Sequence, residues 1–142
     1  MNIKRLVLAF LAVFVFIFAF EWVFHGILLK DAYAHTASLW RPETEMMGYF
    51  HWLVMGQAVI ALAFVLLFAR GFTGRGVAGG IQLGILVAVL RLGLNLITYA
   101  VQPISVKIAL SWSVGGLLEA AVAGAIAGAI YKQAQATAQP SV

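Results

Sequence analysis

The chain has 142 residues, of which 63% are hydrophobic and 10% are charged. A soluble domain carries about 25% charged residues and about 45–50% apolar ones, so this composition excludes an ordinary soluble protein and indicates an integral membrane protein. The cations behind the net charge of +4 fall mostly at the ends of apolar runs and form no basic stripe, so nucleic acid is not a predicted partner. Cysteine is absent, which excludes disulfides, thiolate metal ligands and thiol catalysis.

Four apolar runs are each long enough to cross the hydrocarbon core, which takes about 20 helical residues. They define predicted spans 6–29, 48–69, 77–100 and 108–130 of a single membrane domain, 1–142. The first run exceeds the apolar region of a signal peptide, about 7–15 residues, so we expect it to be a retained transmembrane helix. The predicted fold class is an all-α integral membrane protein, a bundle of four transmembrane helices with up-down topology.

The segments between the spans predict the orientation. Segment 30–47 is the predicted polar outer loop, Pro103 interrupts the helix before the fourth span, and 133–142 is a polar tail. Five loop cations on one side against three on the other predict both termini in the cytoplasm and a multi-pass protein of the inner (cytoplasmic) membrane. The five are Lys4, Arg5, Arg70, Arg75 and Lys132, and the three are Lys30, Arg41 and Lys107. Four aromatic residues fit the belt at headgroup level: Tyr33, Trp40, Tyr49 and Trp52.

Small residues recur at four-residue spacing in the third and fourth spans. Helices in lipid associate through close backbone approach, which small residues permit. We expect this stripe to join the two helices within one chain, and contact with a second copy is the alternative. The helix-packing residues are Gly80, Gly84, Ala120, Gly124 and Gly128.

Each of the four spans carries one strongly polar side chain at a similar depth. Counted from the outer helix ends at 1.5 Å per residue, these side chains lie roughly 12–17 Å deep. A guanidinium at that depth is costly unless acceptors meet it, and its planar fork can satisfy two carboxylates. We therefore predict that Arg91 bridges Glu21 or Glu119. The predicted polar cluster comprises Glu21, Gln57, Arg91, Asn95 and Glu119, with Gln57 completing the hydrogen bonds.

Two carboxylates facing one permanent cation leave a charge imbalance in this cluster. One resolution is that one carboxyl stays protonated, because burial and a neighbouring anion both disfavour its charged form. Such a carboxyl could load and release a proton, and ionisable groups inside a membrane are functional candidates. The alternative is that the cluster only fixes the register of the helices.

Glu21 and His25 are four residues apart on one helix face, and His51 is expected on the same outer side. A site for zinc, iron or manganese built from these three residues is one interpretation. We favour a hydrogen-bonded interfacial histidine instead, because no compact ligand motif is present, and haem ligation by His25 or His51 is weaker still. No cofactor is predicted. Hydrolase, Walker A and dinucleotide motifs are absent, so we predict no catalytic residues and no enzyme.

The pattern resembles a family of small four-helix bacterial integral membrane proteins of unknown function. The resemblance rests on Leu28-Leu29-Lys30 after an aromatic-ended first span, on the close of the third span from Asn95 to Tyr99, and on a small-residue-rich fourth span headed by Lys107. It implies the fold and implies no activity.

Two functions from different classes follow. The first is an oligomeric transporter or channel for protons, cations or a small solute that uses the polar cluster. The alternative is a non-catalytic accessory subunit of a larger membrane complex. The predicted partners are the lipid bilayer and either further copies of the chain or the subunits of that complex.

Overall fold

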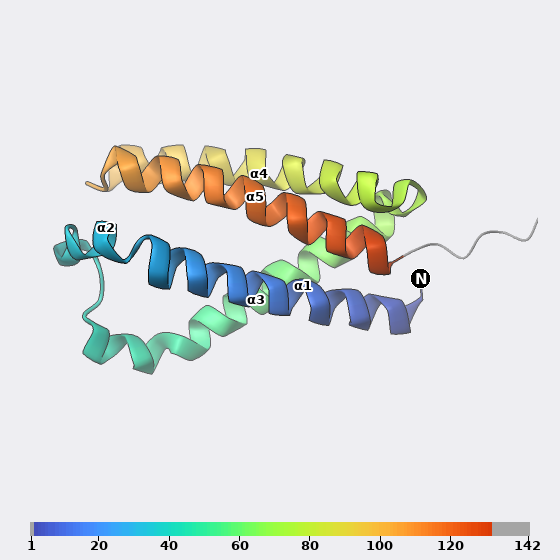
Figure 1. Ribbon diagram of the computed structural model, residues 1–142, viewed down its shortest axis with the longest axis horizontal. Helices are drawn as coiled ribbons and strands as arrows, with labels where there is room; N and C mark the ends of the chain where they lie inside the picture. Colours follow the sequence, from blue (N-terminus) through green and yellow to red (C-terminus); the bar gives the residue numbers. More distant parts are fainter. Residues whose placement is uncertain (1, 132–142) are drawn as a thin grey trace, which may run out of the picture.

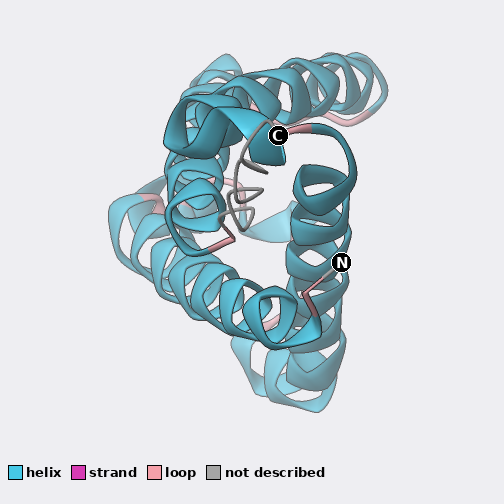
Figure 2. Cartoon of the chain, turned by 90° about the vertical axis from the view of Figure 1, so that its right-hand side faces the viewer, coloured by secondary structure: helices cyan, strands magenta, loops and turns pink. Residues whose placement is uncertain are grey.

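The computed structural model describes residues 2–131, and every element in this range is helical (Figures 1 and 2). The predicted tail 133–142 and Lys132 lie outside the described residues. The α-helices are α1 (Ile3–Val23), α2 (Lys30–Ala34), α3 (Glu43–Gly71), α4 (Gly76–Val101) and α5 (Val106–Ile130). Short helical turns join them: a π-helical turn at Phe24–Leu28 and 3₁₀ turns at Ala37–Leu39 and Thr73–Arg75.

Four helices are long and apolar enough to cross a membrane, as the fold class predicts. The candidate spans are Ile3–Leu28, Glu43–Gly71, Thr73–Val101 and Val106–Ile130. The second begins five residues before the predicted span at 48. Pro42 precedes it with a φ of −56°, and acidic residues occupy its first turn, where they stabilise a helix N-terminus.

Successive long helices run in opposite directions along the molecule (Figure 1). As a result, the start of α1 and the end of α5 lie together, and the backbone N–H of Asn2 donates to the hydroxyl of Tyr131 at 3.1 Å. α4 and α5 form a hairpin, while α3 runs obliquely across the other long helices. The Ser105 side chain caps α5 by accepting from the N–H of Ile108 at 3.3 Å. The expected up-down order of the helices is therefore observed.

The hydrophobic core fills the half of the molecule that contains the start of α1 and the end of α5. α1 and α3 supply most of it, and α4, α5 and Tyr131 close it. The other half is more open, because residues 43–53 of α3 are all exposed. The core residues are Ala9, Val13, Ile17, Ala61, Phe64, Val65, Phe68, Leu83, Ala123, Ala127 and Tyr131.

The small-residue stripe lies where α4 meets α5. A Cβ added to Gly80 would lie 1.8 Å from the carbonyl oxygen of Gly124, and one on Gly84 would lie 2.2 Å from that of Ala120. A Cβ on Gly128 would lie 2.4 Å from the carbonyl oxygen of Gly76. The two backbones are thus in direct contact within one chain.

Candidate functional site: a partly buried ion-pair cluster

The site begins where α1 changes from an α-helix to a π-helical turn. The N–H of Leu29 donates to the carbonyl of Phe24 at 3.0 Å, which closes the wider turn. Such turns occur frequently at functional sites because they redirect side chains. Glu21 precedes the turn and His25 lies in it, and Glu21 Oε2 lies 3.0 Å from His25 Nε2. The end of α1 therefore presents a carboxylate and an imidazole together.

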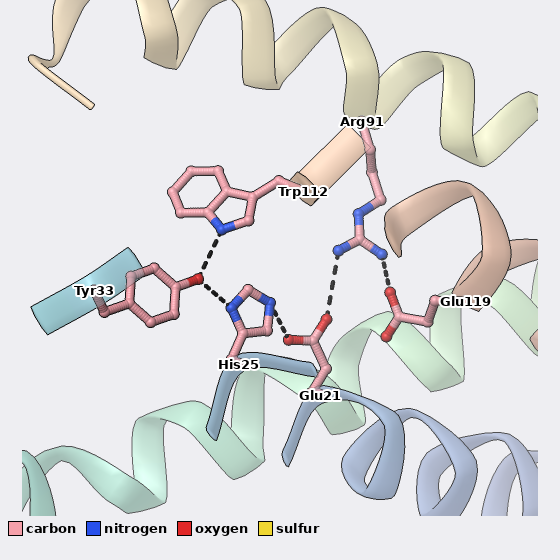
Figure 3. A network of polar contacts seen from close by, with 6 residues as sticks. All are labelled: Glu21, His25, Tyr33, Arg91, Trp112 and Glu119. Carbon is pink, nitrogen blue, oxygen red and sulfur yellow. Dashed lines mark hydrogen bonds and ion pairs between the residues drawn. The ribbon is translucent and has the colours of Figure 1, made fainter. Parts of the chain in front are cut away.

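Arg91 of α4 joins this pair to α5 (Figure 3). Its Nη2 lies 3.5 Å from Glu21 Oε1, and its Nη1 donates to Glu119 Oε2. Glu119 is only 2% exposed, so its charge is compensated almost entirely by the guanidinium. The guanidinium lies beside the backbone of α5, since a Cβ on Gly116 would make an ordinary contact with Arg91 Cζ at 3.6 Å. Three helices thus meet at one guanidinium between two carboxylates.

A cavity of about 250 Å³ surrounds the ion pairs. Polar groups from α1, α4 and α5 share its wall with aromatic rings, which lower the local dielectric and strengthen the electrostatic interactions. The lining residues are Phe20, Glu21, Phe24, His25, Arg91, Asn95, Trp112, Gly115, Gly116 and Glu119.

α2 follows the π-helical turn and brings Tyr33 to His25. The Tyr33 hydroxyl lies between two nitrogens, His25 Nδ1 and Trp112 Nε1, the latter at 2.7 Å (Figure 3). Trp40 packs edge-on against both Tyr33 and Trp112, with ring centroids 5.2 and 6.1 Å away. Burial raises the pKa of the Tyr33 hydroxyl, so it keeps its proton at neutral pH. We call Tyr33, Trp40 and Trp112 the aromatic cap.

The structure brings together four of the five residues of the predicted polar cluster. Glu21, Arg91 and Glu119 are in contact, and Asn95 lines the same cavity. The sequence predicted that Arg91 bridges Glu21 or Glu119, and in the structure it contacts both carboxylates. Gln57 is the exception. It is buried on α3, yet its Oε1 has no hydrogen-bond partner among the described residues, so the expected completion of the cluster by Gln57 is wrong.

The two histidines of the predicted metal site, His25 and His51, lie in different places in the structure. His25 belongs to the site, whereas His51 is exposed on α3, where its ring lies beside Trp52. Within residues 2–131 no three His, Cys, Asp or Glu side chains lie close enough together to hold a metal ion. The proposed metal site of Glu21, His25 and His51 is therefore not assembled. His25 contacts Tyr33 and Glu21, in agreement with the hydrogen-bonded histidine that we favoured, and its position at the membrane interface stays a prediction.

Sequence reasoning missed the roles of Tyr33 and Trp112. It placed Tyr33 in the aromatic belt and gave Trp112 no role. One signal was available, since both have a polar group on an aromatic ring and buried Tyr and Trp usually find a hydrogen-bond partner. The partner itself depends on how sharply the chain turns between α1 and α2.

Comparison with protein-family models, with curated proteins and with solved structures finds no match to this chain. The resemblance to the small four-helix bacterial family stays a prediction. The chemistry of the site is therefore argued from its own residues. A low-dielectric cavity in which two carboxylates oppose one guanidinium favours an added proton or a cation over an anion.

Proposed function

We propose that this protein is a membrane transporter or channel that moves protons or small cations through the cavity around Arg91. One observation carries the proposal: Arg91 contacts both Glu21 and Glu119, so the surplus carboxylate must be balanced by something that the site can gain and lose. The cavity volume of about 250 Å³ lies below the 300–1,000 Å³ of drug-sized ligand pockets, which favours a very small cargo.

The arrangement also supports an oligomer. The half of the chain beyond the cavity is filled by core side chains such as Val65 and Phe68, which are fully buried. A single copy therefore has a cavity in one half and a close-packed hydrophobic core in the other half. Transport requires a second copy to complete the path, or a movement of the helices. We place both termini in the cytoplasm, so that the aromatic cap lies on the opposite side of the cytoplasmic membrane.

Flux into liposomes tests this function. Purified protein is reconstituted into vesicles with an imposed membrane potential, and internal pH is followed with a dye. We expect proton uptake above that of empty vesicles and a decrease of about tenfold or more in Glu119→Gln and Glu21→Gln, since a positioned proton-transfer group contributes about 10²–10⁴-fold. Glu43→Gln is the matched control, because Glu43 is exposed at the start of α3. Wild-type uptake equal to that of empty vesicles would overturn the proposal.

The alternative is an accessory subunit of a larger membrane complex. It is supported by the first part of α3, where residues 43–53 are exposed and include Phe50, Trp52 and two methionines. Such a surface suits contact with another chain as well as with lipid. Native purification and mass determination distinguish the two functions. Copies of this polypeptide alone support transport, and stoichiometric foreign chains support the accessory role.

A further inference from the structure

The aromatic cap fixes the direction of the hydrogen bonds that lead to Glu21. An indole nitrogen can only donate, so Trp112 must donate to the Tyr33 oxygen. Donation of the Tyr33 hydroxyl proton to His25 Nδ1 is the arrangement in which every hydrogen bond of the row points toward Glu21. With Nδ1 as acceptor, the neutral imidazole carries its proton on Nε2 and donates to Glu21 Oε2 at 3.0 Å.

We propose that Tyr33 and His25 relay protons between the aqueous side at α2 and Glu21, and that Trp112 is the positioning residue that sets the direction of the relay. This proposal rests on the proposed function and deepens it, because it names the route by which protons reach the carboxylates. The row in Figure 3 is continuous from the aromatic cap to the buried Glu119. Tyr33 is half-buried and is the member of the row that α2 supplies.

The transfer balances without any further reactant. A hydronium ion from the aqueous side gives a proton to the Tyr33 oxygen and leaves as water, while the original hydroxyl proton passes to His25 Nδ1. The bond between His25 Nε2 and its proton breaks, and that proton passes to Glu21 Oε2. Tyr33 and His25 each end with one proton, and Glu21 becomes neutral. Rotation of the hydroxyl and exchange of the imidazole protons restore the starting arrangement.

The charged and titratable groups around His25 agree with this direction. Glu21 faces it from the same helix and Tyr33 from α2. Trp112 of α5 packs beside the imidazole, with ring centroids 6.4 Å apart, and does not titrate. Arg91 of α4 lies beyond Glu21 and contacts Glu119 as well. Because a guanidinium is always charged and has no acceptor, the arriving proton binds a carboxylate and not Arg91.

Proton flux in reconstituted vesicles tests the relay with two substitutions. Tyr33→Phe keeps the ring and removes the hydroxyl, and His25→Ala removes the imidazole. We expect both to lower the initial rate about tenfold or more, as loss of a positioned proton-transfer group does. Added imidazole should restore much of the rate in His25→Ala and none in Glu21→Gln, which a merely structural role of His25 would not produce. Tyr49→Phe and His35→Ala are the matched controls, since both residues lie on exposed segments outside the cavity.

A spectroscopic measurement tests the same geometry without flux. Nitrogen-15 NMR of labelled histidine, assigned by loss of the His25 signal in His25→Ala, reports which ring nitrogen carries the proton. We expect the Nε2–H form in the wild type and a mixture of both forms in Tyr33→Phe and Trp112→Phe. An Nδ1–H form in the wild type overturns the relay. Flux that falls in Glu119→Gln but stays unchanged in Tyr33→Phe and His25→Ala also overturns it and leaves the proposed function standing.

Discussion

α4 and α5 meet in two different ways along their length. Near the chain ends they touch backbone to backbone, and a Cβ on Gly80 would lie 1.8 Å from the carbonyl oxygen of Gly124. Toward the aromatic cap the glycines of α5 face side chains instead. A Cβ on Gly115 would lie 2.3 Å from the ring of Phe24, and one on Gly116 would lie 3.6 Å from the guanidinium of Arg91.

The comparison teaches that one small-residue pattern serves two purposes. Where both helices present glycine, the pair closes into a dry contact that holds the hairpin. Where only α5 is small, Phe24 of the π-helical turn packs against Gly115, Arg91 of α4 lies beside Gly116, and a polar cavity forms. The first region fixes the helices, and the second uses that fixed geometry to place charges. The substitutions below separate these two roles.

The largest effect is expected at the guanidinium. Arg91→Leu leaves Glu21 and Glu119 without their cation, so we expect a loss of about 3 kcal/mol in the free energy of unfolding, together with loss of flux. This value is the lower end of the range for buried ion pairs, because the Arg91 side chain is 35% exposed. Unfolding in mixed micelles measures it. Arg70→Leu, at the exposed end of α3, is the control and should cost less than about 1 kcal/mol.

A slightly smaller loss of stability is expected in the dry contact. Gly80→Ala forces the two backbones apart, and overpacking of this kind costs about 1–3 kcal/mol. Gly93→Ala on the same helix meets nothing within 4 Å and should be neutral or stabilising by up to about 1 kcal/mol. The same unfolding assay compares the two variants. Equal stability of both would show that the backbones do not touch in solution.

Gly115 and Gly116 sharpen the contrast within the cavity. Gly115→Ala pushes against the tip of the Phe24 ring, which can shift, so we expect a cost of about 1 kcal/mol and a change in flux. Gly116→Ala makes only ordinary contact with Arg91 and should change the free energy of unfolding by less than about 0.5 kcal/mol. A larger cost for Gly116→Ala than for Gly115→Ala would contradict the placement of these two side chains.

The smallest effect concerns alkaline pH. Burial raises the pKa of the Tyr33 hydroxyl above its ordinary value of about 10, so the folded protein keeps a proton that the unfolded chain loses. The resulting stability is complete below about pH 10 and falls as the pH rises through the folded pKa. Unfolding midpoints between about pH 9 and 11 should therefore fall less steeply in Tyr33→Phe than in the wild type. Tyr99→Phe, an exposed site on α4, is the control.

Much of the fold could be predicted from the sequence, because a run of about 20 apolar residues has one stable structure in lipid. The number of residues from each helix end also predicted that Glu21, Arg91 and Glu119 are in contact, since ionisable groups at one level of a helix bundle pair with one another. The orientation in the membrane and the number of copies stay predictions, because both depend on partners outside the chain.

Depth alone does not fix rotation about the helix axis, and this explains what failed. Gln57 is buried on α3, which runs obliquely across the other long helices, and its Oε1 has no hydrogen-bond partner in the described range. His51 was expected on the same side of the membrane as His25, but its side chain is exposed on α3. The π-helical turn after Val23 sets the directions of the His25 and Tyr33 side chains. The spacing of hydrophobic residues in the sequence does not predict such a turn.

A double-mutant cycle between Arg91 and Glu119 tests the central claim most directly. Unfolding free energies are measured for the wild type, Arg91→Leu, Glu119→Gln and the double variant. Residues in direct contact give an interaction energy of about 0.5–3 kcal/mol, so we expect the double variant to lose at least about 1 kcal/mol less than the sum of the single variants. Losses that add within about 0.5 kcal/mol, as distant sites do, would contradict the account.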